Sequence, residues 1–267
     1  MIYNILAGEL KKVLKSKLFL ISMIIYILIF VIALVNRFFN KTSGVYLYKI
    51  ELEKLNSFSL IFFYIMHVLF LGAVLGGYVG GYEFHSNTFC FSHIFEGRIK
   101  QHVLKIFTLL ILLVGILLIT FIITNVFCVF RISDIEFRFN FKRLIGQSLV
   151  ILLISFELSL FSYILAIVIR KIYVAISVAV LLPFLINILC NISNVFKYLN
   201  KYWFTTVNSM LISQVFSNIA SSENYVTIKL IDKSILNSFN LLLLVSISYL
   251  IVFLVIILLI GFFVSDN

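Results

Sequence analysis

The residues best suited to chemistry lie in one short polar stretch between two long apolar runs. Glu83 is followed by His85, His93, Glu96 and His102, and carboxylates and imidazoles bind metals and exchange protons in hydrolases. A helical metalloprotease motif, HExxH, needs two imidazoles on one helical face with a carboxylate beside them. Here successive histidines are eight and nine residues apart. An intramembrane metal-dependent hydrolase using Glu83, His85 and His93 is therefore an alternative that the spacing disfavours, and solvated loop histidines explain the pattern better.

A second chemical feature is Glu157, the one acidic residue well inside a long apolar run. A carboxylate in a membrane is costly, so it is a functional-site hypothesis by default. Three interpretations stay open: Glu157 lines a translocation path, it pairs with a cation, or it is protonated and hydrogen-bonded to Ser155, Ser159 or Ser162 on nearby turns.

Two backbone features predict how the apolar segments pack. Small residues recur at four-residue spacing before the polar stretch, which places each row on one helix face and lets two backbones approach closely, either statically or at a surface that shifts. Pro183 removes a backbone donor within another apolar run and predicts a kink, which is either a hinge or a static packing feature. The two rows are Gly72, Gly76 and Gly80, and Ala73, Gly77 and Gly81.

The composition defines the surroundings of these residues. The chain has 267 residues, of which 63% are hydrophobic and only 12% charged, with a mean hydropathy of +1.16. Average soluble domains are nearer half apolar and a quarter charged, whereas apolar runs long enough to cross a bilayer, about 20 residues, recur along this chain. The sequence therefore predicts an all-α polytopic membrane protein with a single transmembrane domain, residues 1–267.

The net charge of +10 does not indicate a nucleic-acid partner, because the basic residues flank the apolar runs. Membrane topology and anionic lipid explain such positions better. Cys90, Cys128 and Cys190 have no CxxC spacing, and we interpret them as packing residues rather than a disulfide framework or a metal site. No cofactor is predicted.

The apolar runs predict six spans. Residues 1–17 precede them as an amphipathic interfacial helix, with apolar residues at helical spacing and lysines between or beyond them. The long connection 194–240 contains apolar pieces that are too short to span a bilayer. They predict re-entrant or interfacial half-helices that cap the outer end of the bundle. The six spans are about 18–36, 58–81, 103–130, 144–169, 172–193 and 241–263.

The distribution of Lys and Arg predicts the orientation. The outer segments of this topology carry more basic residues in total, but Lys11, Lys12, Lys15 and Lys17 before the first span form the densest cluster. Because the first helix usually dominates orientation, we expect both termini on the cytoplasmic side.

The sequence contains no nucleotide-binding motif. There is no GxxxxGK[ST] pattern, no Ser/His/Asp elbow and no kinase-like set, and no aqueous segment is long enough for a nucleotide-binding domain. We therefore do not expect an enzyme. If ATP drives this protein, another polypeptide supplies the ATP site.

The segment Gly80-Gly-Tyr-Glu-Phe-His-Ser-Asn-Thr88, followed by Gly97-Arg98 and Lys105, resembles the ABC-2-type permeases, the membrane subunits of ATP-binding-cassette exporters. In that family a G-x-YEF-x-x-G-T-like segment ends the second span, and a basic residue and a lysine open the third. Asn87 stands where glycine is usual, and Asn tolerates a left-handed turn. His85 stands where a basic residue is usual, which weakens a charge role there. The layout of essentially the whole chain is similar as well.

The resemblance implies that residues 83–102 form a cytoplasmic coupling helix seated against a separate ATPase. Glu83 and Arg98 would be its polar anchors. Two copies of the ATPase and a second permease, identical or homologous, would complete the transporter in a bacterial cell membrane. The apolar contact with the ATPase would come from Phe89, Phe91, Ile94 and Phe95.

In size and in its Phe/Ile/Lys-rich composition the chain looks most similar to permeases of lantibiotic-immunity and bacitracin-resistance exporters. The resemblance thus implies export of an amphipathic substrate, such as a peptide antibiotic or a lipid-like molecule, and antibiotic resistance as the result. Besides the hydrolase, a further alternative is a membrane-anchored immunity protein that sequesters a peptide at 194–240 without pumping.

Overall fold

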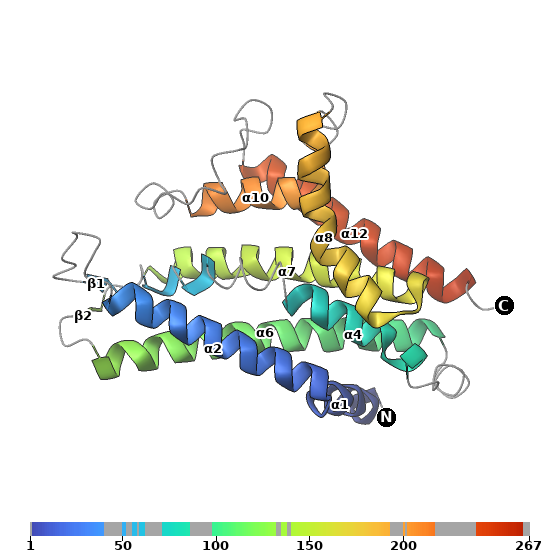
Figure 1. The fold of residues 1–267 in the computed structure, drawn as a ribbon, viewed down its shortest axis with the longest axis horizontal. Helices are drawn as coiled ribbons and strands as arrows, with labels where there is room; N and C mark the ends of the chain where they lie inside the picture. Colours follow the sequence, from blue (N-terminus) through green and yellow to red (C-terminus); the bar gives the residue numbers. More distant parts are fainter. Residues whose placement is uncertain are drawn as a thin grey trace.

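The structure is a computed structural model, and its long helices lie side by side along one axis (Figure 1). The chain is a multi-pass helical membrane protein, because four helices are long and apolar enough to cross a bilayer. The residues described are 2–39, 50–51, 55–57, 59–61, 71–85, 98–131, 135–137, 140–192, 200, 202–216 and 239–263.

Four of the six predicted spans are confirmed as such helices. The spans predicted at 18–36, 103–130, 144–169 and 241–263 correspond to α2 (Lys17–Phe39), α6 (Arg98–Arg131), α7 (Phe141–Ile169) and α12 (Phe239–Phe263).

The other two predicted spans are not shown as full crossings. In the region predicted at 58–81 the described helix is α4 (Gly72–His85), and residues 62–70 lie outside the described part. In the region predicted at 172–193, α8 (Ile172–Ile192) is helical over 21 residues. Its side chains are described without a gap only over Ile172–Leu182, so this span is not tested. The prediction of six spans is thus supported for four.

Local sequence explains where the first helices begin and end. Ser16 separates α1 (Ile2–Leu14) from α2, because its hydroxyl accepts a hydrogen bond from the backbone N–H of Phe19 at 3.1 Å, a typical N-cap contact. In the same way, the side chain of Asn140 accepts from the N–H of Arg143 at the start of α7. Arg170 ends α7 in the left-handed conformation, with φ of 58°.

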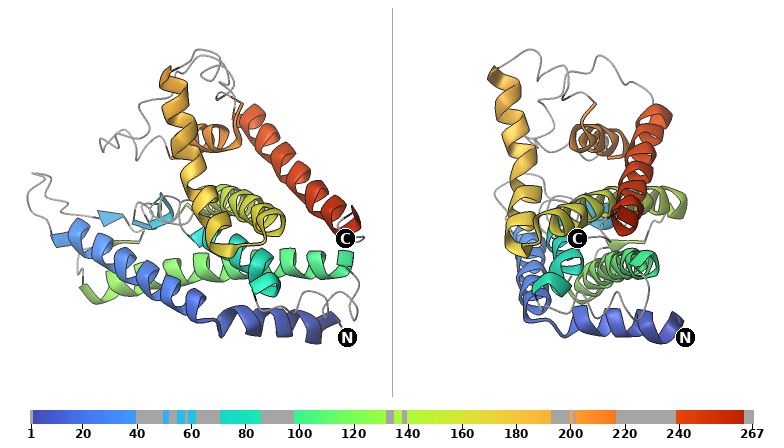
Figure 2. Two further views of the ribbon diagram at one scale, coloured as in Figure 1. Left: turned by 45° about the vertical axis from the view of Figure 1, so that its right-hand side comes forward. Right: turned by 90° about the vertical axis from the view of Figure 1, so that its right-hand side faces the viewer.

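Helix α1 lies across one end of the bundle, as expected of an interfacial helix. The right-hand view of Figure 2 shows it lengthwise below the ends of the long helices. Val13 is buried against the bundle, whereas Lys11, Lys15 and Leu14 are exposed. An amphipathic helix at a bilayer surface divides its residues in this way.

The short helix α4 forms the centre of the bundle. It packs against α7, α8 and α6, and every residue from Gly72 to Gly81 is buried. By contrast, α2, α12 and the outer face of α6 expose many large apolar side chains, as expected where lipid is the neighbour.

Several helix ends and the two strands lie at one or the other end of the long axis (Figure 1). At one end β1 (Ile50–Glu51) pairs in parallel with β2 (Ile135–Glu136), Ile50 opposite Ile135. At the other end lie α1, the end of α4, the start of α6, the turn from α7 to α8 and the end of α12. The predicted outer connections 37–57 and 131–143 therefore meet at one end, opposite α1.

The predicted half-helices are represented by α10 (Phe204–Val215). It packs against α7 and α12 and runs beside α7 rather than above its end (Figure 1). The rest of the connection from 217 to 238 lies outside the described residues. A short helix is thus present within the connection and packs against the bundle, and whether it is re-entrant or interfacial stays a prediction.

Helix α8 changes direction along its length and its second half leaves the bundle (Figures 1 and 2). Pro183 stands within this 21-residue helix, where it removes one backbone donor and favours a bend. Exposed Leu185, Ile188 and Leu189 follow it. The predicted role as a moving hinge stays a prediction.

Candidate functional site

The first buried polar cluster joins α4 to α6 at the end of the bundle where α1 lies. The Glu83 side chain is almost fully buried, with 2% of the residue exposed. Lys105 Nζ lies 2.8 Å from its Oε2, and Gln101 Nε2 donates to its Oε1 at 2.5 Å. Because Gln101 and Lys105 are four residues apart on α6, both reach the carboxylate from one helical face. Glu83 thus fastens the end of α4 to the start of α6.

A second acid extends this cluster to α1. Glu9 is buried and pairs with Lys12 at 2.5 Å. Glu9, Lys12, Glu83 and Lys105 line one small cavity, so acids and lysines alternate around it and the local charge is balanced. The interfacial helix is therefore tied to the same place as α4 and α6.

A histidine beside this cluster joins α6 to α7 and α12. His102 is buried, its Nδ1 lies 2.6 Å from the hydroxyl of Tyr163, and its ring meets the Tyr163 ring edge-on. A side chain on Gly261 would lie 2.7 Å from Cδ2 of His102, so glycine there lets α12 approach. His102 acts here as a packed core histidine rather than a solvated loop residue.

The predicted coupling segment lies only in part within the described residues. Residues 83–85 belong to α4 and residues 98–102 to α6, so the two ends of the segment continue the membrane helices. Arg98 begins α6. Phe89, Phe91, Ile94 and Phe95 lie outside the described residues. Of the two predicted polar anchors, Glu83 directs its carboxylate to partners within the chain.

The glycine rows of α4 face two different helices. Added Cβ atoms on Gly76 and Gly80 would lie 2.0 Å from the carbonyl oxygen of Ser159 and 2.8 Å from that of Tyr163, both on α7. The backbones of α4 and α7 therefore touch, which no larger residue would allow. Ser162 strengthens this contact, since its hydroxyl donates to the carbonyl of Ala73 at 2.6 Å.

The other row of glycines faces α8. Added Cβ atoms on Gly77 and Gly81 would lie 2.5 Å from side-chain carbons of Ile176 and Ile172 respectively. Gly72, at the start of α4, is buried as well. The close helix contact expected from the four-residue spacing is thus present on both faces, and whether it slides stays a prediction.

The second buried polar cluster surrounds Glu157 in the middle of α7. Its carboxylate accepts from Asn208 Nδ2 on α10 at 2.7 Å and from the Ser246 hydroxyl on α12. Ser246 also lies 3.2 Å from Oδ1 of Asn208. All three residues are almost completely buried. Within the described part of the chain these donors are neutral, and they come from other helices rather than from the serines near Glu157 on α7.

Aromatic rings anchor α10 beside this cluster. Phe204, 2% exposed, lies 5.2 Å from Phe161 of α7 and 5.5 Å from Phe253 of α12, measured between ring centroids. The Trp203 ring lies 5.2 Å from that of Phe204, tilted by 51°. Such pairs add to the burial of apolar area, so α10 is held in the bundle by rings and by Glu157 together.

Sequence reasoning did not identify several members of these clusters. Gln101 has no sequence signal beyond its four-residue spacing from Lys105. Asn208 has one, because an amide in an apolar piece that is too short to span must find a buried partner. Ser246 has none, since serine is common in membrane helices. The overlooked pairings join segments that are far apart along the chain.

No candidate metal site is found in the described part of the chain, where no three His, Cys, Asp or Glu side chains converge. His93, a member of the hydrolase hypothesis, lies outside that part. Glu83 and Glu157 instead each lie in a buried hydrogen-bonded cluster that joins helices.

A comparison with models of known protein families finds no match for this chain, and a comparison with curated proteins finds none either.

Proposed function

We propose that this chain is the permease subunit of an ATP-binding-cassette exporter, a transport subunit without catalysis of its own that a separate ATPase drives. The observation that carries the proposal is the Glu83 cluster. It clamps the end of α4 to the start of α6, at the two points where the chain enters and leaves the connection 86–97.

The length of α6 supports a mechanical role for this end. At 34 residues and a rise of about 1.5 Å per residue, α6 is about 51 Å long. A hydrocarbon core is only about 30 Å thick, so α6 continues well beyond it. A helix of this length carries a push at its Arg98 end into the bilayer as a rigid rod.

Close packing supports transmission of such a push to other helices. Since α4 touches α7 through Gly76 and Gly80, displacement of the clamped ends of α4 and α6 displaces α7 as well. Interiors without gaps transmit strain rather than absorb it. An ATPase bound at 83–102 through Phe89, Phe91, Ile94, Phe95 and Arg98 would thus move the bundle as a unit.

In this proposal α4 and α8 belong to the second and fifth of six spans, and the end of the bundle with α1 faces the cytoplasm. Two permeases, identical or homologous, and two ATPases form the transporter in a bacterial cell membrane. The cargo is an amphipathic peptide antibiotic or lipid-like molecule, since the helices present apolar surface with few charges. Glu157 is assigned to holding α10 in place rather than to lining the path, because it is fully buried.

The test is affinity purification of the full chain from its native membranes, followed by an efflux assay. We expect an ATPase with a Walker motif to co-purify. Cells that carry the chain should survive nisin or bacitracin only while this partner ATPase can hydrolyse ATP. Phe91→Ala should abolish both co-purification and survival. Phe137→Ala, an exposed aromatic at the opposite end of the bundle, is the control and should change neither.

Two other outcomes would replace the proposal. Peptide or lipid hydrolysis by the purified chain alone, lost on addition of a chelator, would favour the metal-dependent hydrolase. Protection that persists without any ATPase would favour a protein that sequesters peptide at 194–240.

A further inference from the structure

An unusual concentration of positive charge surrounds a hollow between α1, α2, α4 and α8. The hollow has a volume of about 550 Å³. It is lined by four lysines and three tyrosines, together with the backbone of the α1–α2 junction. The lysines are Lys11, Lys12, Lys15 and Lys17, and the tyrosines are Tyr78, Tyr82 and Tyr173.

Most of this charge has no counter-charge within the described residues. Lys12 pairs with Glu9, but no carboxylate of the described part lies within ion-pair distance of Lys11, Lys15 or Lys17. The first turn of α2, which begins at Lys17, contains no acidic residue. The partial positive charge of its N–H groups therefore adds to that of the lysines. These positive charges would stabilise a negatively charged group bound in the hollow.

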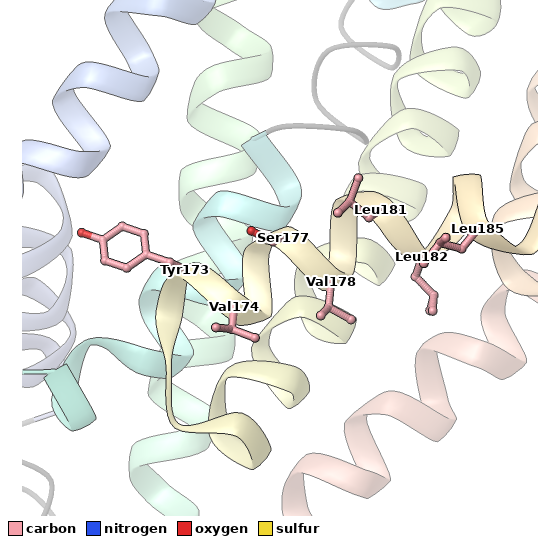
Figure 3. A pocket seen from close by; sticks show the side chains of 7 residues that line it. All are labelled: Tyr173, Val174, Ser177, Val178, Leu181, Leu182 and Leu185. Carbon is pink, nitrogen blue, oxygen red and sulfur yellow. The ribbon is translucent and has the colours of Figure 1, made fainter.

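A second, apolar hollow adjoins the first one at Tyr173. It has a volume of about 310 Å³ and follows α8 from Tyr173 to Leu185. Figure 3 shows the Tyr173 ring directed away from α8 toward the N-terminal helices, whereas Val174 and Val178 lie below α8 in this view. Apart from Tyr173 and Ser177 its lining side chains are purely aliphatic.

Measured along the path of α8, which changes direction (Figure 1), the apolar hollow is about as long as one leaflet of a hydrocarbon core is thick. Twelve steps of about 1.5 Å along the helix give a length of about 18 Å, and half of a hydrocarbon core is about 15 Å. The basic hollow lies beside α1, and the predicted interfacial position of α1 would place this hollow at the depth of lipid head groups. Tyrosines, which have an apolar ring and a polar tip, are typical of that depth.

We infer that these two adjoining hollows bind one anionic membrane phospholipid, with its phosphate against Lys11, Lys15 and Lys17 and an acyl chain along α8. The phospholipid bridges α1 to α8, which otherwise meet only at the rim of the basic hollow. This inference goes beyond the proposed transport function and does not depend on it, because it concerns a resident lipid and not the cargo.

The single tryptophan of the chain allows a direct test. In the variant Trp203→Phe with Tyr173→Trp, the only tryptophan lies where the two hollows meet, and its fluorescence is excited selectively. The purified full chain is reconstituted in vesicles of phosphatidylcholine that contain a small fraction of dibrominated phosphatidylglycerol or dibrominated phosphatidylcholine. We expect brominated phosphatidylglycerol to quench this tryptophan at a concentration at least about tenfold lower than brominated phosphatidylcholine, because the lysines attract the anionic head group.

Two further variants test the binding of the head group and of the acyl chain separately. Lys11→Gln, Lys15→Gln and Lys17→Gln together should abolish the preference for phosphatidylglycerol. Val178→Phe, which fills the apolar hollow, should weaken quenching by both lipids. Lys142→Gln with Arg143→Gln, a basic pair in the first turn of α7, is the matched control and should leave the preference unchanged.

Three results would overturn the inference. The first is equal quenching by the two brominated lipids in the reporter variant. The second is an undiminished preference in the triple lysine variant while the chain stays folded by circular dichroism. The third is displacement of phosphatidylglycerol by soluble glycerol phosphate alone, which would identify a phosphate site without a lipid chain.

Discussion

Glu83 and Glu157 are both buried acids, yet the chain satisfies them in different ways. Glu83, at the end of the bundle, has a full positive charge at 2.8 Å and an amide, both from α6. Among the described residues, the partners of Glu157 in the middle of α7 are an amide and a hydroxyl, from α10 and α12. A charged partner stabilises an ionised carboxylate, whereas neutral donors fix its position at lower electrostatic gain. We therefore call the ion-paired cluster of Glu83, Gln101 and Lys105 the charge clamp. The cluster of Glu157, Asn208 and Ser246, which holds α10 by neutral hydrogen bonds, is the positional clamp.

The largest effect should come from removing the cation of the charge clamp. Lys105→Met leaves the Glu83 carboxylate buried without its ion-pair partner, which typically costs about 3–5 kcal/mol of stability. Unfolding of the purified chain in detergent, followed by circular dichroism, measures it. Lys100→Met, an exposed lysine on the same helix, is the control and should have little effect. If the double variant Lys105→Met with Glu83→Met is not more stable than Lys105→Met alone, the loss in Lys105→Met does not come from an unpaired Glu83 carboxylate.

A comparable loss is expected where α4 touches α7. Gly76→Ala places a Cβ atom 2.0 Å from the carbonyl oxygen of Ser159. Since that atom belongs to a backbone, the helices must separate, and overpacking of this kind costs about 1–3 kcal/mol or more. Thermal unfolding in detergent measures the loss.

The chain offers matched controls for this substitution. Gly115→Ala in α6 and Gly146→Ala in α7 add the same methyl group where nothing lies within 4 Å, and alanine is the better helix former. Both should be neutral or slightly stabilising. Equal losses at all three glycines would mean that α4 does not contact α7 in the membrane.

The positional clamp should respond less to loss of charge than to loss of a partner. Asn208→Leu leaves one oxygen of Glu157 without its donor, at a cost of about 1–3 kcal/mol, and should loosen α10. Glu157→Gln keeps an acceptor for Asn208 and should cost less than Glu83→Gln, because no buried cation is orphaned. Thiol labelling of Leu211→Cys, a buried position on α10, reports release of that helix in each background. A larger loss of stability for Glu157→Gln than for Glu83→Gln would mean that the charge matters more at Glu157 than at Glu83.

The helices were easier to predict than the clamps for a physical reason. Hydropathy measures the transfer of each residue into lipid, so the extents of α2, α7 and α12 follow from single residues in order along the chain. The four-residue spacing of the α4 glycines likewise needs only one helix. The Glu157 cluster instead joins residues 38 to 89 positions apart. No local period encodes such pairings, and only the cost of a buried carboxylate signalled that partners must exist.

The course of α8 is a second feature that the order of residues along the chain did not predict. Residues 172–193 read as a uniform apolar run, but α8 changes direction and leaves the bundle. Hydropathy along the chain does not report the direction of a helix, so the course of α8 did not follow from its apolar residues. Pro183 was the one local sign of a bend.

The smallest effect concerns an exposed cation next to the charge clamp. Arg170 ends α7 with φ of 58° and places its guanidinium 5.9 Å from the centre of the Phe84 ring. Arg170→Gly relieves a left-handed residue, worth about 1 kcal/mol, and loses a cation–π contact, worth about 0.5–1 kcal/mol at an exposed site. The two terms nearly cancel, so stability should change by less than about 0.5 kcal/mol.

A double-mutant cycle separates the two terms at Arg170. With Phe84→Leu already in place, the cation–π contact is gone, so Arg170→Gly should then stabilise the chain by nearly the full conformational term. Unfolding in detergent of the four proteins of the cycle gives the coupling energy directly. A coupling of zero would mean that Arg170 does not rest on Phe84. The stability of this end of the bundle would then depend on the buried charge of Lys105 and not on the exposed charge of Arg170.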